Sequence, residues 1–149
     1  MRIAVLNGPN LNLLGSRDPA LYGTTTLAAV EAHLVALGRE LGVEIECAQH
    51  NVEGALVEIV HAMRGRVDGV VVNAGAYSHT SLALRDALTG VSLPFIEVHV
   101  TNVYAREPER HHSMLASAAL GVVVGLGTQG YELAVRGLVH ALRGRGTRA

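Results

Sequence analysis

Two kinds of hydrophobic pattern alternate along the chain. Short runs rich in β-branched residues, bounded by turn-forming residues, predict five strands, at residues 3–6, 43–48, 69–73, 94–99 and 120–124. Between these runs, apolar residues recur at intervals of three and four, which predicts helices. We expect them from a cap at Thr25 or Thr26 to Gly42, from a cap at Asn51 through Met63, and over residues 80–88 and 128–142.

Strands that alternate with helices are typical of an α/β fold with a parallel sheet. The third and fifth predicted strands are nearly continuous aliphatic runs, as expected when helices cover both faces of a strand. Right-handed crossovers favour a doubly wound, five-stranded sheet of order 2-1-3-4-5. No repeat or linker divides the chain, so we expect one domain over residues 1–149, with a frayed tail from about residue 143.

In such a sheet, ligands bind beyond the carboxyl ends of the strands, where the strand order reverses. The polar residues of the chain collect in the three loops found there. They are Asn7, Asn10, Asn12, Arg17 and Tyr22 after the first strand; Asn73, Ser78 and His79 after the third; and Glu97, His99, Thr101, Asn102, Arg106 and Arg110 in and after the fourth. The sequence therefore predicts a polar site at this edge of the sheet.

The composition narrows the chemistry of that site. A chain that is 49% hydrophobic and 17% charged is not disordered, and a net charge of −1 gives no basic field for nucleic acid. All 12 cationic residues are arginine, so no lysine can form a Schiff base.

The sequence also favours a cytoplasmic protein. The single cysteine, Cys47, cannot form an internal disulfide, and the first ten residues lack the apolar core of a secretion signal. The longest continuous apolar run, near residue 119, is far shorter than a membrane span, so no membrane partner is expected.

Three arginines point to an anionic ligand. Arg17, Arg106 and Arg110 lie in two loops that this fold brings together, and a guanidinium group matches carboxylate or phosphate geometry. A single arginine is more often part of a surface ion pair. Three that converge indicate a site for a small anion.

Tyr22 is one of only five aromatic residues and follows Arg17 by five positions. A free tyrosine is only about 0.1% ionised at neutral pH, and ionising it costs about 4 kcal/mol. Two nearby guanidinium groups could supply that energy and make the phenolate a base. The alternative is a loop tyrosine that only covers apolar surface.

A second titratable group lies at the end of the fourth strand. Side chains alternate along a strand, so Glu97 and His99 share one face, and the carboxylate would orient the imidazole as a general acid. A histidine that is merely a buried structural partner is the alternative. Asn73 and His79 flank a glycine-containing turn and could donate to hydroxyl groups.

Two features do not indicate a cofactor or a metal. The GxGxxG pattern at residues 125–130 follows the last strand, where no further strand can deliver a ribose-binding acid, so we interpret it as a tight turn. The eight histidines show no metal-ligand spacing, so no metal is expected. Cys47 is interpreted as a small buried apolar residue.

Three segments together resemble the type II 3-dehydroquinate dehydratases over almost the whole chain. They are VLNGPNLNLLG at 5–15 with Arg17 and Tyr22-Gly23, NAGAYSHTS at 73–81, and EVHVTN at 97–102 with Arg106-Glu107. The resemblance implies a flavodoxin-like fold and the cofactor-free dehydration of 3-dehydroquinate to 3-dehydroshikimate, in the shikimate pathway or quinate catabolism. It also implies a dodecamer built as a tetramer of trimers.

The resemblance implies a role for each site residue. Tyr22 would be the base, with Arg17 stabilising its phenolate, and Asn10 would hold a water at the enolate oxygen. His99, oriented by Glu97, would protonate the leaving hydroxyl. The substrate would be bound by Asn73, His79, Asp86, Val100, Thr101, Arg106 and Arg110, with Asp86 reaching a neighbouring subunit's site and Arg106 closing with the loop before the first helix.

Three positions depart from the family pattern: Ala74 where proline is common, Thr101 where serine is usual, and Glu109 where an aromatic residue precedes the arginine. We expect Glu109 to weaken Arg110. None of these changes removes a catalytic residue.

Two other classes of protein stay open from the residues alone. One is a non-catalytic small-anion binding module on a flavodoxin-like fold, and the other is a flavin or nucleotide carrier. The scarcity of aromatic residues speaks against the carrier.

Overall fold

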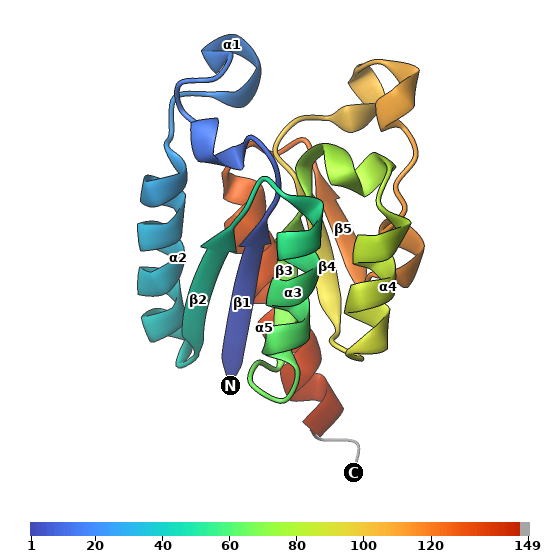
Figure 1. The fold of residues 1–149 in the computed structure, drawn as a ribbon. Helices are drawn as coiled ribbons and strands as arrows, with labels where there is room; N and C mark the ends of the chain where they lie inside the picture. The colour runs from blue at the N-terminus through green and yellow to red at the C-terminus, as the bar shows by residue number, and fades with distance from the viewer. Residues whose placement is uncertain (147–149) are drawn as a thin grey trace.

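Five parallel strands form one central sheet in the computed structural model, which describes residues 1–146. The strands are β1 (Arg2–Asn7), β2 (Glu44–Gln49), β3 (Gly69–Asn73), β4 (Phe95–His99) and β5 (Gly121–Val124). Their order is β2-β1-β3-β4-β5 and every pairing is parallel, so all carboxyl ends lie at one edge (Figure 1). The predicted doubly wound, flavodoxin-like sheet is confirmed.

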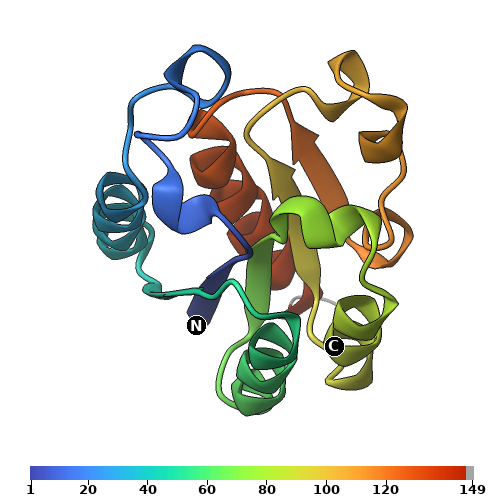
Figure 2. The same ribbon diagram turned by 45° about the horizontal axis from the view of Figure 1, so that its top comes forward.

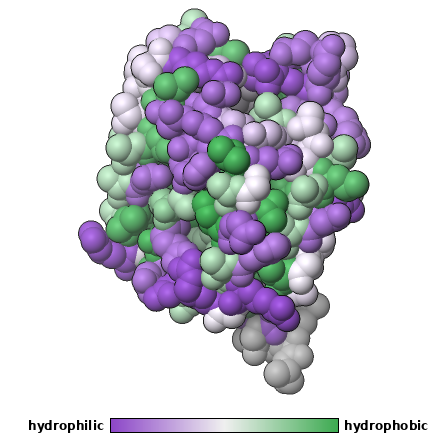
Figure 3. Space-filling view, in the orientation of Figure 1, coloured by the Kyte–Doolittle hydropathy of each residue, from purple (hydrophilic) through white to green (hydrophobic). Residues whose placement is uncertain are grey.

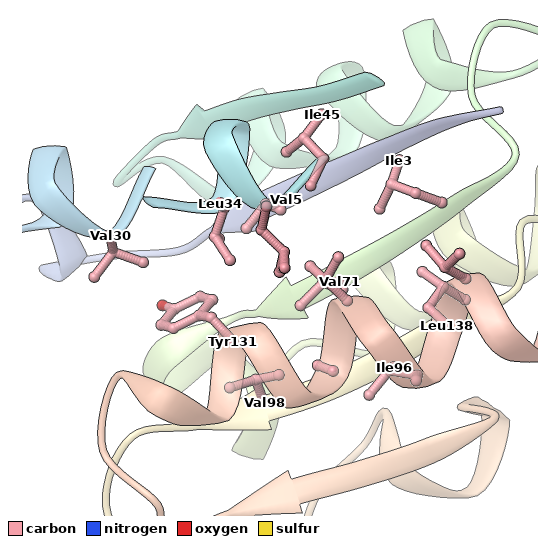
Figure 4. Packing of buried hydrophobic residues seen from close by; sticks show 14 of the residues in the cluster. Ile3, Val5, Val30, Leu34, Ile45, Val71, Ile96, Val98, Tyr131 and Leu138 are labelled. Carbon is pink, nitrogen blue, oxygen red and sulfur yellow. The ribbon is translucent and has the colours of Figure 1, made fainter. Parts of the chain in front are cut away.

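Helices cover both faces of the sheet. Helices α2 (Leu27–Leu41) and α5 (Gln129–Gly146) lie on one face, and α3 (Glu53–Met63) and α4 (Leu82–Gly90) lie on the other (Figure 1). Because strand side chains alternate, Ile3 and Val5 pack with α2 and α5, whereas Ala4 and Leu6 pack with α3 and α4. Figure 4 shows the first of these two core layers.

The ends of α2 follow the sequence signals. The hydroxyl of Thr26 accepts a hydrogen bond from the Ala29 N–H at 3.2 Å, and Gly42 ends the helix in the left-handed conformation. Helix α4 begins later than predicted. Its first residue is Leu82 because Ser81 is its cap: the Ser81 hydroxyl accepts a hydrogen bond from the Leu84 N–H at 2.9 Å.

The predicted Asn51 cap of α3 is wrong. The residue before the first helical turn is Val52, and no side chain caps the helix. The Asn51 side chain is engaged elsewhere: its Oδ1 accepts from the backbone N–H of Asn10 and from Gln49, both at 3.0 Å. A tertiary contact therefore takes the oxygen that a local cap would have used.

The expectation of a frayed tail from residue 143 also needs correction. Residues 143–146 continue α5 rather than fray, and Arg143 donates a hydrogen bond of 2.5 Å to the Leu41 carbonyl. Residues 147–149 lie outside the described residues.

The expectation that helices cover both faces of the fifth strand is wrong. Every residue of β3 is buried, as expected. In contrast, β5 is an edge strand paired only with β4, and Val122 is 41% exposed.

The segment Pro19–Leu41 is long and apolar enough to be compared with a membrane span. It is divided by Gly23–Thr26 into the short helix α1 (Pro19–Tyr22) and α2. The apolar residues Val30, Leu34 and Leu37 of α2 are buried against the sheet. These properties are those of an amphipathic helix packed by one side on a sheet rather than of a continuous spanning helix.

Candidate active site

The loops at the carboxyl edge of the sheet enclose a pocket of about 150 Å³. Helix α1 and the segment of residues 100–113 both extend beyond this edge of the sheet (Figures 1 and 2). The surface at this end of the molecule is mainly hydrophilic (Figure 3). The pocket lining includes these predicted site residues: Asn10, Arg17, Tyr22, Asn73, His79, His99, Val100, Thr101, Arg106 and Arg110.

Two predicted site residues do not line the pocket. Glu97 is fully buried behind His99, which it contacts directly. Asp86 is exposed on α4, away from the strand-end loops. Within one chain, the predicted site is therefore complete except for Asp86.

Close backbone packing shapes the floor of the pocket. The Gly8 N–H donates to the Asn73 carbonyl at 2.8 Å, and a Cβ at Gly8 would lie 2.3 Å from the Ala74 carbonyl oxygen. Only glycine permits this approach between the ends of β1 and β3. Asn10 follows in the left-handed conformation (φ +67°), and Asn51 holds its backbone N–H.

The glycine-rich turn supports the end of β4, which confirms its interpretation as a tight strand-to-helix turn. Gly125 and Gly127 donate backbone hydrogen bonds to the carbonyls of His99 and Val100, at 3.1 and 3.0 Å. Both glycines have positive φ, and a Cβ at Gly125 would lie 3.0 Å from the Cβ of Asn102. The turn thereby fixes the backbone of the β4 end that lines the pocket.

Two guanidinium groups flank the ring of Tyr22. The central guanidinium carbon lies 4.8 Å from the ring centroid in Arg17 and 5.6 Å in Arg106. Arg106 also donates to the Thr101 hydroxyl at 3.2 Å. The residues that the sequence proposed as a base and its activators therefore lie together, with Tyr22 at the end of the short helix α1 rather than in an irregular loop.

Arg110 is paired, but not with the residue expected from the sequence. Its Nε donates to Glu107 Oε1 at 2.5 Å, and the second Glu107 oxygen lies 3.8 Å from Arg106 Nε. The hydrogen bond from Arg110 lowers the pKa of Glu107, so this carboxylate stays ionised. Glu109 makes no ion pair among residues 1–146, so its proximity in sequence does not neutralise Arg110.

His99 is held by a buried carboxylate. Its Nε2 lies 2.6 Å from Glu97 Oε1, which also accepts a hydrogen bond of 2.7 Å from the Ser113 hydroxyl. The backbone N–H groups of Leu115 and Ala116 lie 3.1 Å from the same hydroxyl and hold Ser113 in place. A carboxylate can only accept, so His99 Nε2 carries hydrogen and Nδ1 is its free nitrogen.

His79 accepts rather than donates in its neutral form. Its Nδ1 lies 2.8 Å from the His112 carbonyl, so Nδ1 carries the hydrogen and Nε2 is a lone-pair acceptor. Burial lowers the pKa of His79, and the charges of His99 and Arg110 lower it further. In this neutral tautomer Nε2 would accept from a hydroxyl, so the donor role expected for His79 would need the imidazolium form. Its ring stacks on that of His99, with centroids 5.9 Å apart.

Four residues of the site's support were not identified from the sequence as functional: Asn51, Glu107, Ser113 and Tyr131. Glu107 and Ser113 lie within three residues of Arg110, which was the only local signal. Asn51 was interpreted as a helix cap and Tyr131 as part of an apolar helical stripe. Their contacts, with Asn10 and with Asn73, span 41 and 58 residues and leave no local pattern.

The fold and the pocket define a flavodoxin-like α/β protein whose pocket is lined by three arginines, one tyrosine and two histidines among other residues. Residues 1–139 match the family model of class II dehydroquinases. The chain is 66% identical over 142 residues to the 3-dehydroquinate dehydratase of Gemmatimonas aurantiaca, covering 95% of this chain and 93% of that protein. It is 59% identical over 133 residues to catabolic 3-dehydroquinase 1 of Aspergillus terreus, covering 89% and 88%.

A solved structure agrees. Type II dehydroquinase from Propionibacterium acnes superposes with a TM-score of 0.89 at 44% identity, covering 93% of this chain and 96% of that one. The chain belongs to the class II dehydroquinase family. The resemblance predicted from the sequence motifs is thereby confirmed.

Proposed function

We propose that the protein is a hydro-lyase that converts 3-dehydroquinate to 3-dehydroshikimate and water. Family membership and the names of relatives over nearly the whole chain support the reaction. The observation that carries it is a pocket with Tyr22 between two guanidinium groups and with the buried Glu97–His99 pair. A module that only binds anions would need the arginines but not the acid pair.

The first step removes a proton from the carbon next to the ketone. The phenolate of Tyr22 takes this proton, and the electron pair moves into an enolate. The positive charges of Arg17 and Arg106, which lie against the Tyr22 ring, stabilise the phenolate. A water held by Asn10 donates to the enolate oxygen.

The second step expels the β-hydroxyl group. The enolate reforms the ketone, the carbon–oxygen bond breaks, and the protonated His99 supplies a proton from Nδ1, so that water leaves. Glu97 stabilises the imidazolium on the opposite side of the ring. The proton on Tyr22 returns to His99 through solvent, and the reaction needs no metal or other cofactor.

The remaining polar residues bind the substrate. Arg106 and Arg110 attract the negatively charged substrate. Asn73 donates hydrogen bonds to its hydroxyls, and His79 accepts from them. The backbone of Val100 and Thr101, together with the Thr101 hydroxyl, binds the carboxylate. Asp86 completes the site of a neighbouring subunit in a trimer, four of which form a dodecamer. We place this enzyme in the cytoplasm, in the shikimate pathway toward aromatic amino acids or in quinate catabolism.

The direct test follows the ultraviolet absorbance of the conjugated enone as purified protein is mixed with 3-dehydroquinate. Activity should appear, persist in EDTA, and leave no mass adduct when borohydride is added with substrate. Absence of enone formation would overturn the proposed function. Loss of rate in EDTA or a covalent adduct would overturn the mechanism alone.

A further inference from the structure

Tyr131 connects two asparagines inside the protein. It lies in the first turn of α5 and is fully buried, in the same core layer as Val30, Leu34 and Val98 (Figure 4). Its hydroxyl lies 2.6 Å from Asn7 Oδ1 and 2.8 Å from Asn73 Nδ2. Asn73 Oδ1 in turn accepts from the Gly75 N–H at 3.2 Å.

The direction of each hydrogen bond in this chain is determined. The Gly75 backbone N–H can only donate, so the Asn73 oxygen must face it and the Asn73 NH2 group must face Tyr131. The Tyr131 oxygen then accepts, and its own hydrogen must go to Asn7. Burial raises the pKa of Tyr131, so the hydroxyl keeps that hydrogen.

The chain of hydrogen bonds ends at the pocket, because Asn73 is part of the pocket lining and is 4% exposed. The amide has two N–H groups and two oxygen lone pairs, and the chain uses one of each. One N–H and one lone pair remain, at positions fixed by Tyr131 and Gly75. Without the Tyr131 oxygen, the NH2 group would lose the partner that holds it in place.

We infer that Tyr131 is a positioning residue for the proposed dehydration, on which this inference rests. It holds the Asn73 NH2 group in the orientation that the Gly75 N–H selects, and so fixes where the remaining N–H and lone pair of Asn73 meet a substrate hydroxyl. The network leaves Asn7 Nδ2 buried without a hydrogen-bond partner among residues 1–146. A buried amide is expensive to leave half paired, which is consistent with a role beyond packing.

The test is a double-mutant cycle of Tyr131→Phe and Asn73→Ala. Phenylalanine keeps the ring and removes only the hydroxyl. We expect Tyr131→Phe to raise KM about tenfold with kcat reduced less than threefold, and to change KM less than twofold when Asn73 is already alanine. Val60→Ala, in the core layer on the opposite face of the sheet, is the control that lowers stability without altering KM.

A readout independent of activity follows the side-chain amide of Asn73 by 15N NMR, assigned by its loss in Asn73→Ala. Its hydrogens should exchange slowly in the wild type and rapidly in Tyr131→Phe. Asn7→Leu, which removes the acceptor but keeps both other residues, should also speed this exchange and raise KM.

Additive effects of Tyr131→Phe and Asn73→Ala on KM would overturn the inference. An Asn73 amide that exchanges as slowly in Tyr131→Phe and Asn7→Leu as in the wild type would also overturn it. A wild-type protein without dehydratase activity would instead overturn the proposed function. In that case the NMR comparison still decides whether Tyr131 orients Asn73.

Discussion

The carboxylate of Glu97 and the imidazole of His99 lie 2.6 Å apart on one face of β4, with Glu97 fully buried. An ionised carboxylate away from water is costly unless it is paired. The hydrogen bonds that Glu97 Oε1 accepts from His99 and Ser113 offset that cost. In the proposed mechanism, this pair delivers a proton from His99 Nδ1 to the leaving hydroxyl.

Glu97→Gln separates these two effects. The glutamine oxygen can still accept from His99 and Ser113, but the charge that stabilises the imidazolium is lost. We expect kcat to fall about 100-fold, because general acid catalysis is worth at least that factor, while KM changes little. The melting temperature should not fall, because a neutral amide is easier to bury. Steady-state kinetics with thermal unfolding measure both, and an unchanged kcat would show that the charge of Glu97 does not support the acid.

Tyr22→Phe tests the base. Only proton abstraction needs the phenol oxygen, so kcat should fall more than 100-fold while the affinity for a non-reacting substrate analogue changes less than threefold. The ring remains between Arg17 and Arg106 in this variant. Enone formation and analogue binding by calorimetry measure the two effects. A variant that retains more than about a hundredth of the rate has another base.

The sequence was informative wherever a local pattern had a single physical explanation. The valine run of β3 predicted a buried strand correctly, and parallel topology then placed the loops with Asn10, His79 and Arg106 at one edge. The Glu97–His99 contact followed from the alternation of side chains along β4. The geometry of the site was predictable to the extent that it depends on strand register.

Contacts between distant segments were not predictable. Asn51 is a residue type that often caps helices, yet its oxygen accepts from Asn10, which lies 41 residues away. Even a local choice was open, because Arg110 pairs with Glu107 rather than with its neighbour Glu109. β5 resembles β3 in sequence, but an edge position leaves Val122 exposed. In each case several partners were chemically equivalent, and the three-dimensional arrangement selected one.

Ala74 offers a stability test of a family position that is commonly proline. Its φ of −75° matches proline, Asn73 before it is extended, and its N–H donates no hydrogen bond in residues 1–146. Ala74→Pro should therefore raise the free energy of unfolding by about 0.4–1 kcal/mol by restricting the unfolded chain. Ala105→Pro is the control: its N–H donates to Asn102, so this variant should be destabilised. Urea unfolding compares them, and a destabilised Ala74→Pro would contradict the argument.

His79 should make stability depend on pH. Burial lowers its pKa in the folded protein, so below about pH 6.5 the unfolded chain binds more protons and stability is lost as the pH falls. His79→Gln keeps a donor for the His112 carbonyl and should flatten this dependence. The slope for one proton is at most about 1.4 kcal/mol per pH unit, and partial exposure makes it smaller. Urea unfolding at about pH 7.5 and 5.5 measures it; parallel curves for both proteins would exclude His79.

Asp86 allows a test of whether a second subunit completes the active site. It is exposed on α4 and outside the pocket of its own chain, whereas Tyr22 lines that pocket. If Asp86 acts on a neighbour's substrate, Tyr22→Phe and Asp86→Ala assemblies are each nearly inactive. Mixed assemblies then contain some sites with an intact Tyr22 facing an intact Asp86. Co-refolding the two variants should restore activity, about a quarter of the wild-type rate for an equal random mixture of independent sites. Native mass spectrometry establishes that subunits have mixed, and mixed assemblies without recovered activity would show that Asp86 does not act across an interface.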